Sequence, residues 1–226
     1  EAGIDWLVLR NHEGLPERNR SKDVDLGLHK KNFGRAHRLI ADALRRNGFD
    51  RELVEDFQYV RCLTYFGDFE DGAHSLKIDL LDGFVFRGAQ IFNFEDLIKV
   101  APEENGIKIP HQTDDGVMLW MKPLLTGGFV KQKYIDDILT AAQADAAAFR
   151  GRLEKSFSSR VGKEVWEKIE RRDLPATVPL QKKLRRAAWW TALRKRPAAT
   201  LLNAFRHYLA EIRRRSPRNP ATFLSV

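Results

Sequence analysis

Three aspartates in two short alternating segments could together hold a metal ion. Asp23 and Asp25 are separated by one residue, and Asp79 lies in a second such segment further along the chain. Side chains at positions i and i+2 of a β-strand project from the same face, about 6–7 Å apart. If the two segments form neighbouring strands, the carboxylates make an oxygen-rich site that suits Mg²⁺ or Mn²⁺ and the phosphates of a substrate. Ions held in this way can activate an attacking hydroxyl and stabilise a leaving pyrophosphate.

The segments that carry the aspartates have the period of half-buried strands. Residues 23–28 alternate strictly, and the face opposite the two aspartates is apolar: Val24, Leu26 and Leu28. Residues 76–81 repeat the pattern, with Lys77 and Asp79 on one face and aliphatic side chains on the other. A short apolar run at residues 6–9 predicts a further buried strand. We therefore expect a sheet with one apolar face and one face that carries the carboxylates.

The other elements change from a mixed pattern to a purely helical one. A helix is predicted from an N-cap at Asn32 to Asn47-Gly48, followed by a strand at 57–66, a turn at 67–72 and a short strand at 107–109. From Asp114 onward the period is helical, and helices are predicted over residues 114–128, 134–149, 162–171 and 180–215. The expected fold is α+β. It comprises a small mixed sheet with flanking helices in residues 1–113, a helical domain in 114–175 and a basic helical extension in 176–226.

The aspartate segments resemble those of a known superfamily. The segment Ser21-Lys22-Asp23-Val24-Asp25-Leu26, after an apolar strand, is similar to the Asp-x-Asp strand of the nucleotidyltransferase superfamily, which has the polymerase-β-like fold. The segment Ile78-Asp79-Leu80 resembles the strand that carries the third carboxylate of that superfamily, and the likeness covers roughly residues 4–110. It implies that Asp23 and Asp25 bind the catalytic metal ions, and that Asp79 completes the site and helps to orient or deprotonate the acceptor.

A narrower resemblance concerns the surrounding motifs. The segments Leu9-Arg10-Asn11, Leu15-Pro16 and 77–84 (Lys-Ile-Asp-Leu-Leu-Asp-Gly-Phe) look closest to nucleotidyltransferase-like proteins of bacterial polysaccharide gene clusters. Some of these are fused to a thymidylate-kinase-like P-loop domain, and residues 213–226 resemble the segment that leads into it. The sequence has no Gly-x-x-x-x-Gly-Lys-Ser/Thr motif, so the kinase half is absent from this chain. The resemblance implies an NTP substrate and a glycan or lipid-linked precursor as the acceptor.

One motif departs from the superfamily pattern. The usual Gly-Ser that holds the nucleotide phosphates at the end of the first strand is replaced here by Arg10-Asn11-His12-Glu13-Gly14. Arg10 could substitute by its charge, and flanking lysines could neutralise a triphosphate, although solvated lysines are equally compatible with the pattern. The candidate nucleotide contacts are Arg10, Asn11, Ser21, Lys22, Lys77, Lys131, Lys133 and Tyr134.

Charge is distributed unevenly along the chain. The net charge is +8, but residues 181–215 alone carry +10 and residues 1–180 sum to −3. The overall basicity is thus no indication of a nucleic-acid-binding domain. Residues 182–215 mix basic and large apolar side chains, which fits a helical pair packed on the protein or on an adjacent kinase-like domain, or a surface for anionic lipid. Nucleic acid ranks last because no recognition motif is present.

The remaining features suit an ordinary intracellular protein. The single cysteine, Cys62, excludes an intramolecular disulfide and is interpreted as a small core residue. No apolar run reaches the roughly 18–20 residues that a membrane span needs, and the N-terminus lacks the pattern of a secretory signal. We expect a cytoplasmic location, with attachment to the inner face of the membrane as an open alternative.

Three functional interpretations follow. The first is Mg²⁺-dependent transfer of a nucleoside monophosphate from an NTP to a hydroxyl or phosphate acceptor. The second is a catalytically degenerate module that keeps the fold as a binding platform for a P-loop kinase domain, which the missing Gly-Ser favours. A protein-nucleotidylating toxin is the alternative enzyme class.

Overall fold

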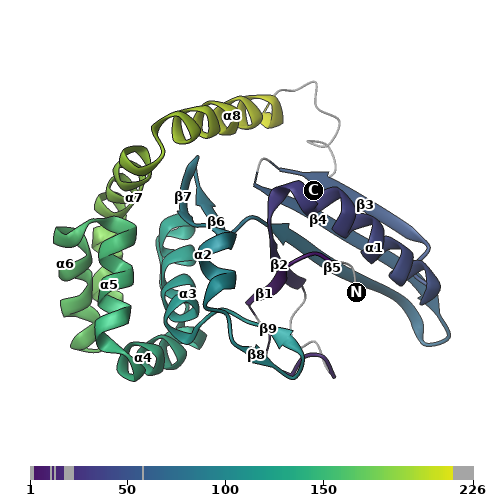
Figure 1. The fold of residues 1–226 in the computed structure, drawn as a ribbon, viewed down its shortest axis with the longest axis horizontal. Helices are drawn as coiled ribbons and strands as arrows, with labels where there is room; N and C mark the ends of the chain where they lie inside the picture. The colour runs from purple at the N-terminus through teal and green to yellow at the C-terminus, as the bar shows by residue number, and fades with distance from the viewer. Residues whose placement is uncertain (1–2, 11, 13, 18–22, 58, 216–226) are drawn as a thin grey trace. The chain divides into compact units, whose positions relative to one another are not determined.

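The computed structural model describes residues 3–10, 12, 14–17, 23–57 and 59–215, and the chain divides into two compact units (Figure 1). The first unit comprises residues 1–84 and 92–111, and the second comprises residues 85–91 and 112–226. A mixed sheet with helices precedes a helical region, which confirms the predicted α+β class. The division into three domains at residues 113 and 175 stays a prediction.

The first unit is built on a five-stranded mixed sheet. In spatial order its strands are β1 (Trp6–Arg10), β2 (Asp23–Leu28), β5 (Gly72–Leu81), β4 (Val60–Phe69) and β3 (Arg51–Asp56). The central strands β2 and β5 run parallel, whereas every other neighbouring pair is antiparallel. The two aspartate segments are therefore adjacent strands, as the site requires.

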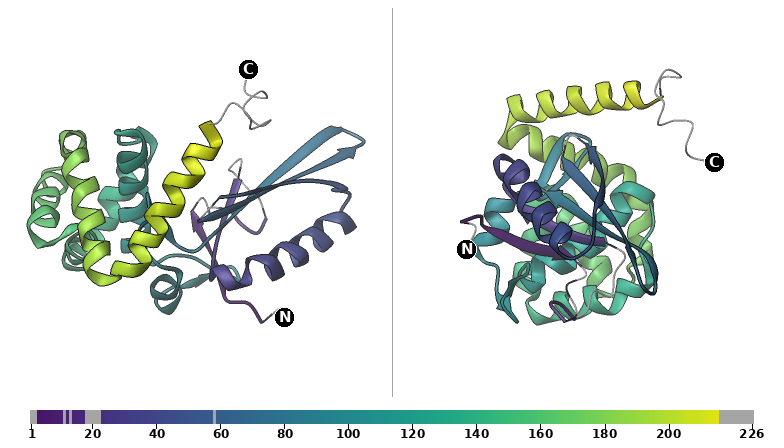
Figure 2. Two further views of the ribbon diagram at one scale, coloured as in Figure 1. Left: turned by 90° about the horizontal axis from the view of Figure 1, so that it is seen from above. Right: turned by 90° about the vertical axis from the view of Figure 1, so that its right-hand side faces the viewer.

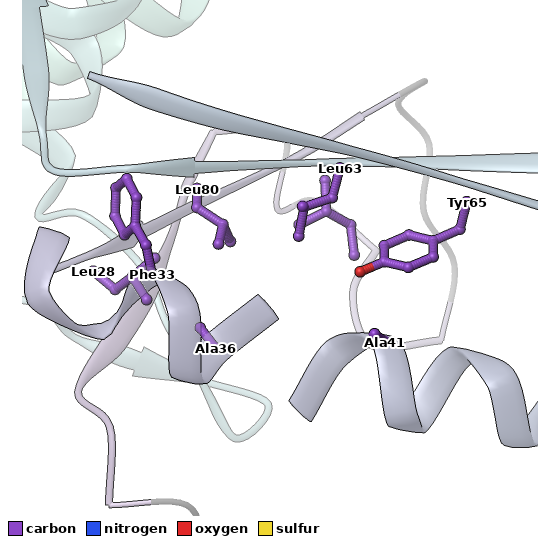
Figure 3. Close-up of a cluster of buried hydrophobic side chains, with 8 residues drawn as sticks. Leu28, Phe33, Ala36, Ala41, Leu63, Tyr65 and Leu80 are labelled. Carbon is purple, nitrogen blue, oxygen red and sulfur yellow. The ribbon is translucent and has the colours of Figure 1, made fainter. Parts of the chain in front are cut away.

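Helix α1 (Phe33–Arg46) covers one face of this sheet (Figure 2). The alternating apolar residues of β2, β4 and β5 meet the apolar stripe of the helix in a single core, drawn in Figure 3: Leu28, Phe33, Ala36, Ala41, Leu63, Tyr65, Ile78 and Leu80. Because side chains alternate along a strand, the residues between these core positions point to the opposite face. Burying one face in this way determines where the aspartates project.

Short elements complete the first unit. A 3-10 turn, η1 (Lys30–Asn32), precedes α1, and His29 caps it by accepting a hydrogen bond from the Lys31 amide at 3.2 Å. Asn32 occupies the predicted N-cap of α1 but makes no side-chain capping bond. The other elements are α2 (Phe94–Lys99) and the ladder of β8 (Glu103–Glu104) with β9 (Ile107–Lys108).

The second unit is mainly helical. It also contains most of a small hairpin, formed by β6 (Phe84–Phe86) and β7 (Ala89–Phe92), whose ends belong to the first unit. Its helical elements follow in chain order: α3 (Gln112–Gly127), η2 (Gln132–Tyr134), α4 (Ile135–Ala144), α5 (Ala146–Phe157), α6 (Ser159–Glu170), η3 (Pro175–Leu180), α7 (Gln181–Lys195) and α8 (Pro197–Arg215).

Trp120 on α3 anchors the core of the second unit. Its ring packs edge-to-face on Phe157 of α5, with ring centroids 5.9 Å apart. The indole N–H donates to the buried Thr177 hydroxyl at 3.1 Å. This bond leaves the large buried ring without an unsatisfied polar atom.

Several predicted boundaries were wrong. Strand β3 was not predicted, because its side chains are all exposed and mostly charged. The strand predicted at 57–66 has the expected length but lies at 60–69, and the strand predicted at 76–81 begins earlier, at Gly72, since the two form a continuous hairpin over residues 60–81. Each of the helices predicted at 134–149 and 180–215 is two helices, broken at Asp145 and at Arg196-Pro197. Within the part of the chain that the structure describes, no helix has the length and apolar character to cross a membrane.

Candidate metal centre

The register between β2 and β5 brings the three predicted aspartates together. Asp25 is the direct neighbour of Asp79, and Asp23 is the neighbour of Lys77. Alternation places all four side chains on the face opposite α1. One carboxylate oxygen from each aspartate lies within 4.8 Å of the other two. The three carboxylates therefore form a single cluster that could hold a metal ion.

Two of these carboxylates have a buried oxygen that accepts no hydrogen bond from the described residues. Asp25 is fully buried, and its Oδ1 accepts no hydrogen bond from any residue that the structure describes. The buried Oδ1 of Asp79 also accepts no hydrogen bond from a described residue, and its ion pair with Lys77 is long, at 3.6 Å. A buried carboxylate oxygen is costly unless a cation or a donor satisfies it. Hard oxygen ligands of this kind fit Mg²⁺ or Mn²⁺, which would satisfy both atoms.

Lys77 is the exposed cation of the cluster. Its Nζ lies 3.6 Å from Asp79 Oδ1, and its side chain is partly open to solvent. Partial burial acts to lower the pKa of Lys77, but the nearby negative charges, of which Asp79 contributes most, and a hydrogen bond to Asp79 together outweigh burial and raise this pKa above its ordinary value. The ammonium stays protonated at neutral pH beside the carboxylates.

Arg10 is the less exposed cation of the cluster. It lies opposite Asp25 on β1, next to an irregularity of the ladder between Val8 and Arg10. Its guanidinium donates a hydrogen bond to Asp25 Oδ2 and forms an ion pair with it. Arg10 was predicted to contact nucleotide phosphate; the structure shows it engaged with a carboxylate, and the phosphate contact stays a prediction.

Cys62 belongs to the same row of side chains, which sequence reasoning missed. It is the antiparallel neighbour of Asp79 across β4 and β5 and therefore shares its face. Burial, followed by a hydrogen bond to Asp79 and the charge of that carboxylate, raises the pKa of Cys62 to about 12. The thiol thus stays protonated and can donate to Asp79. Its apolar surroundings in the sequence gave no signal of this role.

For the other residues predicted to contact the nucleotide, the described part of the structure shows no interaction with the aspartate cluster. Asn11, Ser21 and Lys22 lie outside the described residues. Lys131, Lys133 and Tyr134 belong to the second unit, where the two ammonium groups lie 5.5 and 4.5 Å from the centre of the Tyr134 ring. These cation–π contacts account for the three side chains locally. Their role in nucleotide binding stays a prediction.

Comparisons with known proteins add little to this geometry. No protein-family model matches the chain, and no curated protein matches it. Two solved Helicobacter pylori structures are similar to it. One is JHP933, 17% identical over 90% of each chain with a TM-score of 0.41. The other, described as a "putative nucleotidyltransferase", is 15% identical over 85% of this chain and 88% of that chain, with a TM-score of 0.36. Function is therefore inferred from the residues of this chain.

Proposed function

We propose that this chain is a divalent-metal-dependent nucleotidyltransferase, which moves a nucleoside monophosphate from an NTP to an acceptor hydroxyl or phosphate. The observation that carries the proposal is the cluster of three carboxylates on two adjacent parallel strands, with ligand oxygens within 4.8 Å of one another. Two buried oxygens of this cluster accept no hydrogen bond from the described residues, as expected for ligands of a cation.

Each residue of the cluster has a distinct task in this reaction. Asp23, Asp25 and Asp79 would hold Mg²⁺, whose charge assists loss of pyrophosphate from the α-phosphorus. Asp79 also accepts the proton of the acceptor hydroxyl, while the hydroxyl oxygen forms the new bond to the α-phosphorus. The bond from that phosphorus to the β-phosphate oxygen breaks, and pyrophosphate leaves with the electron pair. Lys77 is partly exposed beside Asp79 and neutralises phosphate charge.

The acceptor and the biological setting are proposed on the sequence resemblance. The motifs around Arg10 and Asp79 resemble nucleotidyltransferase-like proteins of polysaccharide gene clusters. We therefore propose a glycan or lipid-linked precursor as the acceptor and a role in polysaccharide biosynthesis in the cytoplasm. Asn11, Ser21 and Lys22, which adjoin Arg10 and Asp23 in the sequence, are proposed to contact the nucleotide.

Calorimetric titration of each NTP in the presence and absence of Mg²⁺ tests the proposal. Binding should require the ion and should be lost in Asp23→Asn, whereas Asp42→Asn, an exposed aspartate on α1, should bind as the unsubstituted protein does. Labelled-nucleotide transfer onto glycan acceptors and onto lysate proteins then separates a glycan enzyme from a protein-modifying one. Absence of heat with every NTP would refute the proposal.

A binding module without catalysis is the second candidate, and one observation favours it. The Arg10 guanidinium already neutralises Asp25, so the cluster keeps part of its charge balance without an ion. A degenerate site that serves a P-loop kinase domain would retain this pair for stability. Such a module would bind NTP but release no pyrophosphate with any acceptor. The enzyme, in contrast, would release pyrophosphate, and Asp79→Asn would abolish this release.

A further inference from the structure

Helix α8 exposes its large apolar residues and buries its small ones. Six large side chains are between 36% and 67% exposed: Leu201, Leu202, Phe205, Tyr208, Leu209 and Ile212. Their spacing places them within one stripe, about one third of the helix circumference. We call these six residues the α8 stripe. Figure 2 shows α8 as a single long helix that follows α7.

The opposite side of α8 makes the contacts within the second unit. Thr200 and Ala204, one turn apart, are buried there, and no other side chain described on this helix is buried. Gly88 in the turn between β6 and β7 approaches Ala204 so closely that an added Cβ would lie 2.5 Å from the Ala204 amide nitrogen. At the start of the helix, Arg196 donates to the side chain of Gln90 at 3.2 Å. These contacts fix the helix by its small residues and direct the α8 stripe away from that packing.

The charges around the α8 stripe are almost all positive. Residues 194–215 contain seven Lys or Arg and a single acid, Glu211. Arg206 is exposed immediately beside Phe205, at the edge of the stripe, and three exposed basic residues precede the helix: Arg194, Lys195 and Arg196. Pairing with a second copy of the chain would bring two such sets of positive charges into one interface, which is unfavourable.

We propose that α8 is an interfacial helix that binds the surface of a membrane rich in anionic lipid. An apolar stripe on a helix with a strongly basic remainder is suited to lie in the plane of the interface. The six apolar side chains enter the boundary of the acyl chains, and the basic residues contact the anionic headgroups, with the long Arg206 side chain able to reach them from the edge of the stripe. Neither contribution requires the aspartate cluster, so the inference is independent of the proposed nucleotidyl transfer.

Vesicle flotation with the full chain tests this inference. The protein should float with vesicles of one part phosphatidylglycerol to about three parts phosphatidylcholine, and not with phosphatidylcholine alone. Raising the salt concentration to about 0.5 M should release most of the bound protein, because screening shortens the reach of the charges. Phe205→Ser combined with Ile212→Ser should lower the vesicle affinity about tenfold or more.

Matched variants distinguish binding through the α8 stripe from nonspecific hydrophobic adsorption and from the effect of overall net charge. Leu39→Ser combined with Val100→Ser removes two exposed apolar side chains of the first unit and should leave flotation unchanged. Arg206→Glu should weaken flotation about tenfold, whereas Arg171→Glu, the same charge change at the exposed end of α6, should have a much smaller effect. Circular dichroism of each variant verifies that the fold is retained.

Four results would overturn the inference. The first is equal binding to neutral and anionic vesicles, and the second is undiminished flotation of the Phe205/Ile212 double variant. The third is a dimer that this double variant abolishes, in a protein that does not bind vesicles, because a second copy then covers the α8 stripe. The fourth is a monomeric protein that binds no vesicle of either composition. The α8 stripe would then contact another part of the chain or an acidic protein.

Discussion

The two faces of the five-stranded sheet share the same strands and differ in chemistry. On one face, Leu63 and Leu80 pack against α1 with almost no exposure. On the other, one row crosses four adjacent strands and holds Arg10, Asp25, Asp79 and Cys62. The apolar face stabilises the fold by removing hydrocarbon from water, whereas the polar face gathers like charges that the fold alone does not require.

Because alternate residues of each strand lie on opposite faces, stability and function depend on different sets of residues. A position on the apolar face should affect the free energy of unfolding and leave the chemistry of the cluster intact. A position on the carboxylate face should affect ion binding and reaction far more than folding. Substitutions on each face, with exposed residues as controls, test that separation.

The largest expected effect is the loss of nucleotidyl transfer in Asp25→Asn. The substitution preserves shape but removes the charge of a buried ligand, so we expect pyrophosphate release to fall about a thousandfold. The thermal midpoint should change little, since the amide can still accept from Arg10. Asp68→Asn, an exposed aspartate of β4, is the control and should remain fully active. Retention of activity within about tenfold would remove Asp25 from the proposed mechanism.

Leu80→Ala should show the opposite behaviour. Leu80 is fully buried between β5 and α1, and its truncation leaves a cavity, so the free energy of unfolding should fall by about 3 kcal/mol. Urea denaturation measures the change, and Leu53→Ala on the exposed edge strand β3 should cost no more than about 0.5 kcal/mol. Mn²⁺ affinity should be unchanged in both variants. A large loss of ion affinity in Leu80→Ala would show that the two faces are not separable.

The carboxylate face was predictable in its residues but not in its partners. Asp23, Asp25 and Asp79 could be assigned to one face because the strand period of two is local in sequence. The neighbours of these aspartates depend on register, which no local pattern encodes. Cys62 is buried, as its interpretation as a core residue requires, but its place beside Asp79 was missed. The pairing of Arg10 with Asp25 was missed for the same reason.

Element boundaries were predicted well only where a side-chain pattern marks them. Strand β3 is held by its backbone pairing with β4 and carries no apolar alternation that could reveal it. The break between α4 and α5 is set by Asp145, whose side chain caps α5 within an alanine-rich stretch that favours helix throughout. Pro197 begins α8, and a proline at a first helical position was a signal that could have divided the helix predicted at 180–215.

Arg10→Ala tests the ion pair on the carboxylate face. Without an ion, the variant leaves Asp25 buried and without its counter-charge, so the protein should lose about 2 kcal/mol, less than for a fully buried pair because Arg10 is partly exposed. Mn²⁺ should restore more of the thermal midpoint in the variant than it adds to the unsubstituted protein. Arg61→Ala, which breaks an exposed pair with Asp56, should show no such ion-dependent rescue. Equal gains with Mn²⁺ in all three proteins would contradict this role.

The smallest expected effect is on the ionisation of one buried residue on each face, measured by alkaline titration. Burial raises the pKa of both Cys62, on the carboxylate face, and Tyr65, on the α1 face, to about 12. In each case the unfolded chain ionises at lower pH, so the stability contribution is present below that pH and is lost as pH rises toward 12. For Cys62 the window begins near pH 9 and for Tyr65 near pH 10.

The causes of the two shifts differ, and this difference can be measured. Asp79 contributes to the raised pKa of Cys62 through a hydrogen bond and its charge, whereas the shift of Tyr65 has no contribution from the aspartate cluster. Asp79→Asn should therefore lower the pKa of Cys62, seen as faster alkylation by iodoacetamide at mildly alkaline pH. The spectroscopic titration of Tyr65, isolated by comparison with Tyr65→Phe, should be the same with and without Asp79→Asn. If both titrations moved together, the substitution would have loosened the whole sheet, and the chemistry of one face would depend on the packing of the other.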